Sequence, residues 1–198
     1  CAYEGIDLVL HDDGAVVFEV QYLVDLIAGG AFDMIYHEHM DYHTLLPLAC
    51  FLYSMGFTMT YWEHLETHGG SIRVTAERSR AGLEECFYPN ERLDWVYLEN
   101  RMQNAKAKLL SVVVNCAPLV AFGASAKACV MINHFGLAPF ISYVVDDTPE
   151  KQGRYIPGTD ILVKPVEELN GETVLATAWN YIDLIRNRIP NRVIHPFS

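Results

Sequence analysis

The chain has 198 residues, 51% of them hydrophobic and 20% charged, and its formal net charge is −11. This composition suits one or two folded cores and excludes a disordered chain. The negative charge excludes the basic surface that nucleic acids require, and no apolar run is long enough to cross a bilayer, so we expect neither partner. The first residues lack the basic segment of a secretory signal, and we expect the chain to begin within a domain.

The five cysteines are widely spaced and include no CxxC pair. Disulfide frameworks and zinc sites need paired or closely spaced cysteines, so this spacing argues against both. We therefore expect buried, reduced thiols in a cytoplasmic protein.

The first part of the chain is predicted to form a sheet that ends in an antiparallel pair. The predicted elements, in chain order, are a strand over 14–20, a helix over 22–27, a helix over 44–55, and strands over 57–63 and 71–77. Glycines follow both helices, as expected at helix ends. Two alternating strands joined by a short glycine-containing loop indicate a hairpin. This order is typical of the closing half of a Rossmann-type sheet.

The remainder of the chain alternates between strands and helices. A long, mostly polar helix over 84–115, bridging two units, is predicted first. It is followed by a strand over 119–122, a helix over 126–135, strands over 141–145 and 173–177, a helix over 181–187 and a last strand at 193–194. Strands separated by helices predict a parallel sheet with helices on both faces. We therefore predict one domain over 1–82 and a second over 83–198, which includes the bridging helix.

Histidine, glutamate and tyrosine are concentrated between residues 32 and 43. Three of the chain's eight histidines fall within seven positions here, beside Glu38 and Tyr36. A neutral imidazole suits proton abstraction, and a tyrosine hydroxyl can hydrogen-bond an oxygen that becomes negative. Two alternatives remain open. His37 and His39 could be ligands of a metal site, or the segment could be a solvated polar loop. Because neighbouring side chains alternate in a strand, a loop is needed to bring Tyr36, Glu38 and His39 together.

The sequence Gly-Ala-Ser-Ala-Lys at 123–127 follows a predicted strand and opens a predicted helix. Such a turn offers backbone N–H groups and the positive end of a helix dipole to a phosphate. Asp146 and Asp147 end the next strand, near the position at which a carboxylate holds the ribose of NAD. Because Ser125 and Ala128 replace the second and third glycines of the dinucleotide motif, NAD is retained only as an alternative.

Five motifs occur in the order and at the spacing of one known family. They are Tyr-His-Glu-His at 36–39, Thr-His-Gly-Gly-Ser-Ile-Arg at 67–73, Gly-Ala-Ser-Ala-Lys at 123–127, Lys-Gln-Gly-Arg-Tyr-Ile-Pro-Gly-Thr at 151–159 and Ala-Trp-Asn at 178–180. Together they resemble the S-adenosyl-L-methionine-dependent C-methyltransferases of deoxysugar biosynthesis, which act on nucleotide-linked 4-keto sugars. The resemblance covers nearly the whole chain.

The resemblance implies the domain organisation. Members of that family have an N-terminal zinc-binding segment, a central methyltransferase domain and a C-terminal Rossmann-like domain. This chain resembles the second half of the middle domain and all of the last. The implied fold class is α/β, with a partial Rossmann-type methyltransferase sheet that ends in an antiparallel hairpin, followed by a small parallel Rossmann-like domain. The cofactor-binding half and a further catalytic histidine would come from a missing N-terminal segment or a partner chain.

The resemblance also implies the chemistry. His39 would be the general base that removes the proton next to the sugar ketone, and Tyr36 and Glu38 would line the same site. The enolate carbon would then attack the methyl sulfonium of S-adenosyl-L-methionine, and no metal is expected in the site. The expected partner is a nucleotide-linked sugar substrate. The alternatives are a non-catalytic nucleotide-sugar-binding module and an NAD-dependent oxidoreductase domain.

The remaining expected site residues are substrate contacts. They are His68, Ser71 and Arg73 around the glycine turn, Ser125 and Lys127 at the helix start, Lys151, Arg154 and Tyr155 in the loop over 150–158, and Asn180 beside Trp179. That loop follows a strand of a parallel sheet, so Lys151 or Arg154 is expected to contact the pyrophosphate, and Tyr155 the base or sugar. For each group, a structural role is the alternative. The glycines before Ser71 would only permit a turn, the loop over 150–158 would only be solvated, and Trp179 would belong to the core.

Overall fold

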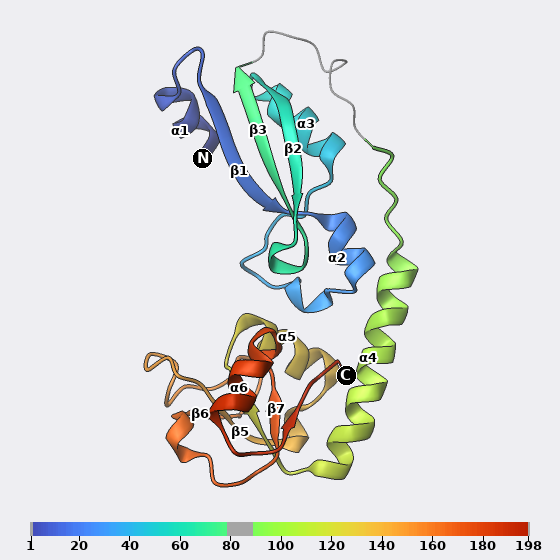
Figure 1. The fold of residues 1–198 in the computed structure, drawn as a ribbon, viewed down its shortest axis with the longest axis vertical. Coiled ribbons are helices and arrows are strands. Elements are labelled where there is room, and N and C mark those ends of the chain that lie inside the picture. The colour runs from blue at the N-terminus through green and yellow to red at the C-terminus, as the bar shows by residue number, and fades with distance from the viewer. Residues whose placement is uncertain (1, 79–88, 198) are drawn as a thin grey trace. The chain divides into compact units, whose positions relative to one another are not determined.

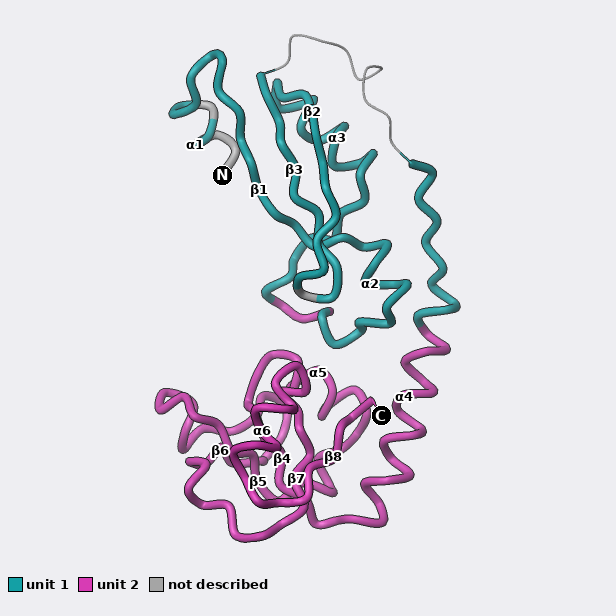
Figure 2. Tube along the Cα trace, viewed as in Figure 1, with its two compact units in different colours: residues 1–34, 38–98 teal, residues 35–37, 99–198 magenta. Residues whose placement is uncertain are grey.

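The computed structural model describes residues 2–78 and 89–197 and shows two compact units (Figure 1, Figure 2). Unit 1 comprises Cys1–Met34 and Glu38–Leu98, and unit 2 comprises Ile35–His37 and Glu99–Ser198. The predicted boundary at residues 82 and 83 lies outside the described residues. Within the described ranges, no helix is both long and apolar enough to cross a membrane.

Unit 1 contains a three-stranded antiparallel sheet. Its elements are α1 (Ala2–Val9), β1 (Ala15–Gln21), α2 (Leu23–Gly29), the 3-10 helix η1 (Phe32–Met34), α3 (Leu45–Ser54), β2 (Phe57–Leu65), η2 (Thr67–Gly69) and β3 (Ser71–Arg78). The strand order is β1-β3-β2, and both pairs are antiparallel. The three predicted strands, both predicted helices and the hairpin are confirmed, whereas the sequence pattern does not predict α1.

The core of unit 1 lies between α3 and the sheet. Its buried members from α3 are Leu45, Leu48, Ala49 and Leu52, at the i, i+3, i+4, i+7 spacing of one helix face. They pack with Tyr22 and with the strand residues Phe57, Met59, Ile72, Val74 and Ala76. Full burial of one leucine stabilises the fold by about 1.5–3 kcal/mol. The loop that leads into α3 and the turn between β2 and β3 are therefore anchored to this layer.

Helix α4 (Trp95–Cys116) begins later than the sequence pattern predicts. Residues 84–88 lie outside the described part of the chain, and residues 89–94 form no helix. The Asp94 carboxylate accepts a hydrogen bond from the backbone N–H of Tyr97 at 2.8 Å and so caps the first turn. The predicted start at residue 84 is therefore wrong, because hydrophobic spacing alone gives no start signal whereas the aspartate cap does.

Unit 2 contains a five-stranded parallel sheet. Its elements after α4 are β4 (Leu119–Phe122), α5 (Ala126–Phe135), η4 (Ala138–Phe140), β5 (Ile141–Val145), β6 (Val163–Lys164), η5 (Val166–Glu168), β7 (Val174–Ala176), η6 (Trp179–Tyr181), α6 (Ile182–Arg188) and β8 (Val193–Ile194). The order is β6-β5-β4-β7-β8, and every pair is parallel. The predicted α/β fold with a parallel second sheet is confirmed, and β6 is a strand that the pattern does not predict.

The strand order of unit 2 places a reversal point between β4 and β7. The chain crosses from β4 through α5 to β5, and from β7 through α6 to β8 in the opposite direction. Because such crossovers are right-handed, α5 and α6 cover opposite faces of the sheet. Val120 and Phe122 pack in one core cluster with Ile185 of α6, and Ala121, which faces the other way, is also fully buried. In α/β folds, ligands bind at the carboxyl ends of the strands at such a reversal point.

Candidate functional site

The predicted catalytic segment is a loop. Residues 35–44 follow η1, whose three residues are buried, and they contain a bend at Tyr36 and a turn at 37–38. The loop leads into α3, where the backbone N–H of Leu45 donates to both carboxylate oxygens of Glu91 at 2.9 Å. The segment is a loop, as expected, whereas the convergence of Tyr36, Glu38 and His39 and the roles of these residues stay predictions.

A carbonyl group fixes the orientation of the His39 ring. Its Nδ1 lies 2.9 Å from the main-chain oxygen of Met34, and the side chain is partly buried. Because a carbonyl oxygen only accepts, Nδ1 must donate its hydrogen. In the neutral ring, the lone pair is then on Nε2. This is the tautomer that a base acting through Nε2 requires.

The other groups of this loop differ in exposure. Glu38 and His37 are exposed, and Tyr36 is partly buried. Among residues 2–78 and 89–197, no three His, Cys, Asp or Glu side chains are grouped so that they could hold a metal ion. The metal alternative for His37 and His39 therefore has no structural support.

The glycine turn before β3 is closely packed within unit 1. Gly70 has a φ of 112°, and a Cβ at this position would collide with the Asp25 side chain. The Ser71 hydroxyl donates to the carbonyl of Thr67 at 3.1 Å, and Ser71 is buried. Gly70 and Ser71 therefore have structural roles in the turn. The side chain of His68, a predicted substrate contact, lies outside the described part of the structure.

Arg73 lies on the unit 1 sheet between two glutamates. It is the cross-strand partner of Glu19 on β1 and of Glu63 on β2. Its guanidinium donates to Glu19 at 2.5 and 3.0 Å and to Glu63 at 2.8 Å. The bonds to Glu19 and to Glu63 raise the pKa of Arg73. Because arginine has five N–H donors, both terminal nitrogens keep a donor for a ligand.

Unit 2 has a crevice at the carboxyl ends of β4, β5 and β7, with a cavity of about 380 Å³. Its lining includes Phe122, Ser125, Asp146, Lys151, Tyr181 and Arg188. The crevice lies at the reversal point of the sheet, where α/β folds bind ligands. The structure therefore brings two predicted substrate contacts, Ser125 and Lys151, into one cavity.

The carboxylate of Asp146, at the end of β5, is held by several donors of the protein itself. Asp146 is 8% exposed and accepts hydrogen bonds from the N–H groups of Ala124 at 2.7 Å and Thr148 at 2.9 Å. Lys151 Nζ contacts the same carboxylate at 3.2 Å. Burial raises the pKa of Asp146, but these bonds outweigh it and hold the pKa below the ordinary value of an aspartate. These partners compete with a ribose hydroxyl for the Asp146 carboxylate, so the geometry gives the NAD alternative no support.

The start of α5 and the segment after β7 meet at the same rim. Ser125 caps α5 by accepting a hydrogen bond from the N–H of Ala128 at 3.2 Å. Lys127 Nζ lies 5.1 Å from the centroid of the Trp179 ring and 3.4 Å from Asn180 Oδ1. Lys127 and Asn180, which are distant in the sequence, are therefore in contact, as a common site requires.

The loop after β5 separates its predicted contacts. Lys151 lines the crevice and pairs with Asp146. Arg154 and Tyr155 are exposed and do not line the cavity. Lys151 is thus paired, and Arg154 lies outside the cavity. A contact of either residue with a pyrophosphate stays a prediction.

Two comparisons identify the family. Residues 66–193 match the family described as C-methyltransferase C-terminal domain. The chain belongs to this family. The C-methyltransferase NovU from Streptomyces niveus is 30% identical over 197 residues, with 89% of this chain and 47% of the relative covered. The chain thus spans about half the length of the curated relative it matches. The family predicted from its motifs is confirmed.

The chain also has an acid–histidine pair that the sequence patterns do not predict. His64 Nε2 on β2 lies 2.9 Å from Asp25 Oδ2 on α2, and the His64 ring packs edge-on against Tyr22 with centroids 5.3 Å apart. Burial raises the pKa of Asp25, and His64 offsets part of this. Burial and a hydrogen bond to Glu91 raise the pKa of Tyr22. No motif contains these residues, so only the fold reveals the pair.

Proposed function

We propose that this chain supplies the catalytic base and the nucleotide-sugar-binding domain of an S-adenosyl-L-methionine-dependent C-methyltransferase. The substrate in this proposal is a nucleotide-linked keto-deoxysugar, and the location is cytoplasmic. The observation that supports it best is the 2.9 Å contact between His39 Nδ1 and the Met34 carbonyl, which leaves Nε2 as the basic nitrogen. Membership of a C-methyltransferase family supports the class of reaction.

His39 is the general base in the proposed reaction. Its Nε2 lone pair takes the proton from the carbon next to the sugar ketone, and the electrons of the broken C–H bond form the enolate. His39 becomes an imidazolium whose Nδ1–H still donates to Met34. The Tyr36 hydroxyl donates to the enolate oxygen, and the Glu38 carboxylate stabilises the imidazolium. A positioned base of this kind contributes about 10²–10⁴-fold to a rate.

S-adenosyl-L-methionine supplies the methyl group in this proposal. A close approach of the backbone to such a cofactor after a strand requires glycine. In unit 1, β1 leads into α2 through Tyr22, which is buried, and not through a glycine. The turn between β1 and α2 therefore lacks the glycine that such an approach needs. We assign that site to a further segment of the same protein or to a partner chain, and the 47% coverage of the relative supports this.

The crevice of unit 2 is the proposed site of the nucleotide. Tyr181 and Leu184 give its cavity an apolar side against which a base can pack. Lys151 or Arg154 contacts the pyrophosphate, and Tyr155 lies near the base or sugar. The N–H groups at the start of α5 favour a phosphate at this rim.

Further proposed substrate contacts lie in both units. In unit 2 they are Ser125, Lys127 and Asn180, which the contact between Lys127 and Asn180 supports. In unit 1 they are His68 and Arg73, and the buried Ser71, predicted as a third contact, instead holds the turn through its bond to Thr67. Arg73 donates to the substrate through the N–H groups that are not bonded to Glu19 or Glu63.

Calorimetric titration of the 198-residue chain with thymidine diphosphate tests the nucleotide site. We expect binding, and we expect Arg154→Glu to weaken it at least about tenfold, because repulsion replaces a charge-assisted hydrogen bond. Lys106→Glu is the matched control, since it reverses one charge on α4, where Lys106 Nζ contacts the carbonyl of His134 at 3.1 Å. Binding of NAD instead of thymidine diphosphate, or an unchanged affinity in both Arg154→Glu and Lys151→Glu, would contradict the proposal.

A non-catalytic nucleotide-sugar-binding module is the second candidate. It is favoured by the absence of a glycine from the turn between β1 and α2. The two candidates differ in what the longer protein does to its ligand. A module binds the nucleotide sugar but leaves the proton next to the ketone in place, whereas an enzyme removes it.

A further inference from the structure

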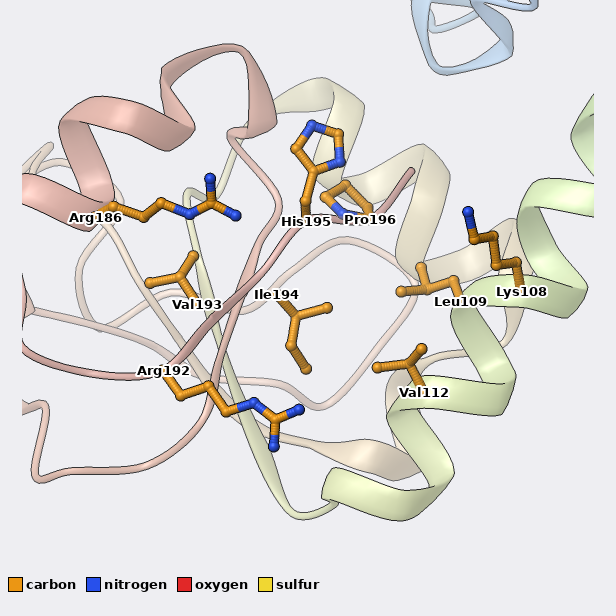
Figure 3. A pocket seen from close by; sticks show the side chains of 9 residues that line it. All are labelled: Lys108, Leu109, Val112, Arg186, Arg192, Val193, Ile194, His195 and Pro196. Atoms are coloured by element: carbon orange, nitrogen blue, oxygen red, sulfur yellow. The ribbon is translucent and has the colours of Figure 1, made fainter. Parts of the chain in front are cut away.

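A second cavity of unit 2 lies along β8, an edge strand of the parallel sheet. It has a volume of about 200 Å³, and residues of β8, α4 and α6 line it (Figure 3). We call it the β8 groove. It shares no lining residue with the crevice, so the two are separate sites.

The charged and polar side chains that line the β8 groove are all basic. They are Lys108 on α4, Arg186 on α6, and Arg192 and His195 on either side of β8, and Figure 3 shows them around the apolar side chains of β8. No aspartate or glutamate is among the nine described residues that line the groove. A chain with a net charge of −11 therefore has a locally positive cavity.

Carboxylates compensate these cations only weakly. In the described part of the chain, neither Lys108 nor Arg192 forms an ion pair. Arg186 approaches Asp183 at 3.9 Å, and both side chains are at least half exposed, so this pair is weak. Cations that share one cavity without a counter-charge repel one another, and a bound anion removes that repulsion.

The crevice of the same unit shows the opposite arrangement. There, Lys151 pairs with Asp146 at 3.2 Å, and Arg188 forms two hydrogen bonds to Asp147. Each of these cations thus has a carboxylate partner within the chain. The β8 groove therefore differs from the crevice in that its cations lack close carboxylate partners among the residues that line it.

His195 adds a hydrogen-bond donor to the groove. The backbone N–H of Phe197 donates to His195 Nδ1 at 3.0 Å, so in the neutral ring the hydrogen is on Nε2. Burial and the positive charge of Arg186 lower the pKa of His195, and Asp183 offsets only part of this. In this tautomer, the Nε2–H is the hydrogen-bond donor of the ring.

Apolar side chains complete the lining of the groove. They are Leu109 and Val112 of α4, Val193 and Ile194 of β8, and Pro196. The cavity of about 200 Å³ is smaller than the roughly 300 Å³ at which sites for drug-sized ligands begin. It therefore suits a small molecule with one charged end and a short apolar part.

We propose that the β8 groove binds a small phosphorylated organic molecule. Its phosphate lies among the three cations of the groove and accepts a hydrogen bond from His195. Its carbon atoms pack against Leu109 and Ile194. A phosphate is favoured over a carboxylate because its higher charge matches several cations and because guanidinium groups bind phosphate oxygens through paired N–H donors.

Isothermal titration of the 198-residue chain with inorganic phosphate and with glycerol 3-phosphate tests this site. We expect both to bind, and glycerol 3-phosphate more tightly, because only it has carbon atoms for the apolar lining. The double variant Arg186→Gln, Arg192→Gln should weaken binding at least about tenfold. Lys108→Gln, on a different element, should weaken it in the same direction. Both arginines are exposed, so these changes should leave the unfolding temperature nearly unchanged.

Matched variants outside the groove identify where the phosphate lies. Lys106→Gln removes a charge from the same helix as Lys108 and should leave the affinity unchanged, because Lys106 contacts the His134 carbonyl outside the groove. Loss of phosphate binding in Lys151→Gln, with the arginine double variant unaffected, would place the phosphate in the crevice. That result would overturn the inference while supporting the proposed nucleotide site.

Three further results would also overturn the inference. The first is no measurable binding of either ligand at millimolar concentration. The second is an unchanged affinity in the arginine double variant. The third is an equal affinity for the two ligands, which would identify the bound species as the inorganic ion only.

Discussion

Replacement of His39 by asparagine is expected to lower the methyl-transfer rate of the intact enzyme by about 10²–10⁴-fold. The asparagine side-chain nitrogen takes the place of Nδ1 and can keep the hydrogen bond to the Met34 carbonyl, whereas the basic Nε2 is lost. The loop is thus preserved, and the loss of rate reports the base itself. Steady-state kinetics with saturating methyl donor should show the loss in kcat, with KM for the nucleotide sugar little changed.

His37→Asn is the control for this substitution. It makes the same chemical change two residues away in the same loop, at an exposed position. We expect its rate to stay close to that of the wild type. A His39→Asn enzyme that is as active as His37→Asn would show that another group removes the proton.

Gly70→Ala is expected to cause a large loss of stability in unit 1. The added Cβ collides with the Asp25 side chain, and the φ of 112° is one that L-residues rarely adopt. Backbone strain of this kind costs about 1–3 kcal/mol, and overpacking costs about 1–3 kcal/mol more. We therefore expect the free energy of unfolding to fall by about 2–6 kcal/mol. Urea unfolding followed by far-UV circular dichroism measures the change.

Gly56→Ala separates the two causes of that loss. Gly56 also has a positive φ, of 84°, but nothing lies within 4 Å of an added Cβ. It should therefore show the backbone cost alone, about 1–2 kcal/mol. Equal losses in the two variants would mean that Gly70 and Asp25 are not in close contact in solution.

Local signals explain why most elements could be predicted from the sequence. In α5, the Ser125 cap and Gly136, with a φ of 68°, mark both ends of the helix. Strand β4 is four consecutive buried residues, as expected in the middle of a parallel sheet. Strand β6 has no such signal, because it has two residues and forms where Val163 pairs with Val144. That contact joins distant positions and depends on the fold.

The same distinction applies to the candidate site. Tyr36, Glu38 and His39 are neighbours in the sequence, so a motif can predict them. The contact between Asp25 and His64 joins α2 and β2, and the β8 groove combines residues of α4, α6 and β8. No local pattern links these positions, because only the folded chain brings them together.

Hydrogen exchange at the carbon next to the ketone tests the central claim most directly. The intact enzyme is incubated in D₂O with its keto sugar nucleotide and without the methyl donor, and deuterium at that carbon is measured by NMR. We predict that the wild-type enzyme catalyses the exchange and that His39→Asn does not. Exchange at the wild-type rate in His39→Asn would contradict the claim that Nε2 of His39 removes the proton.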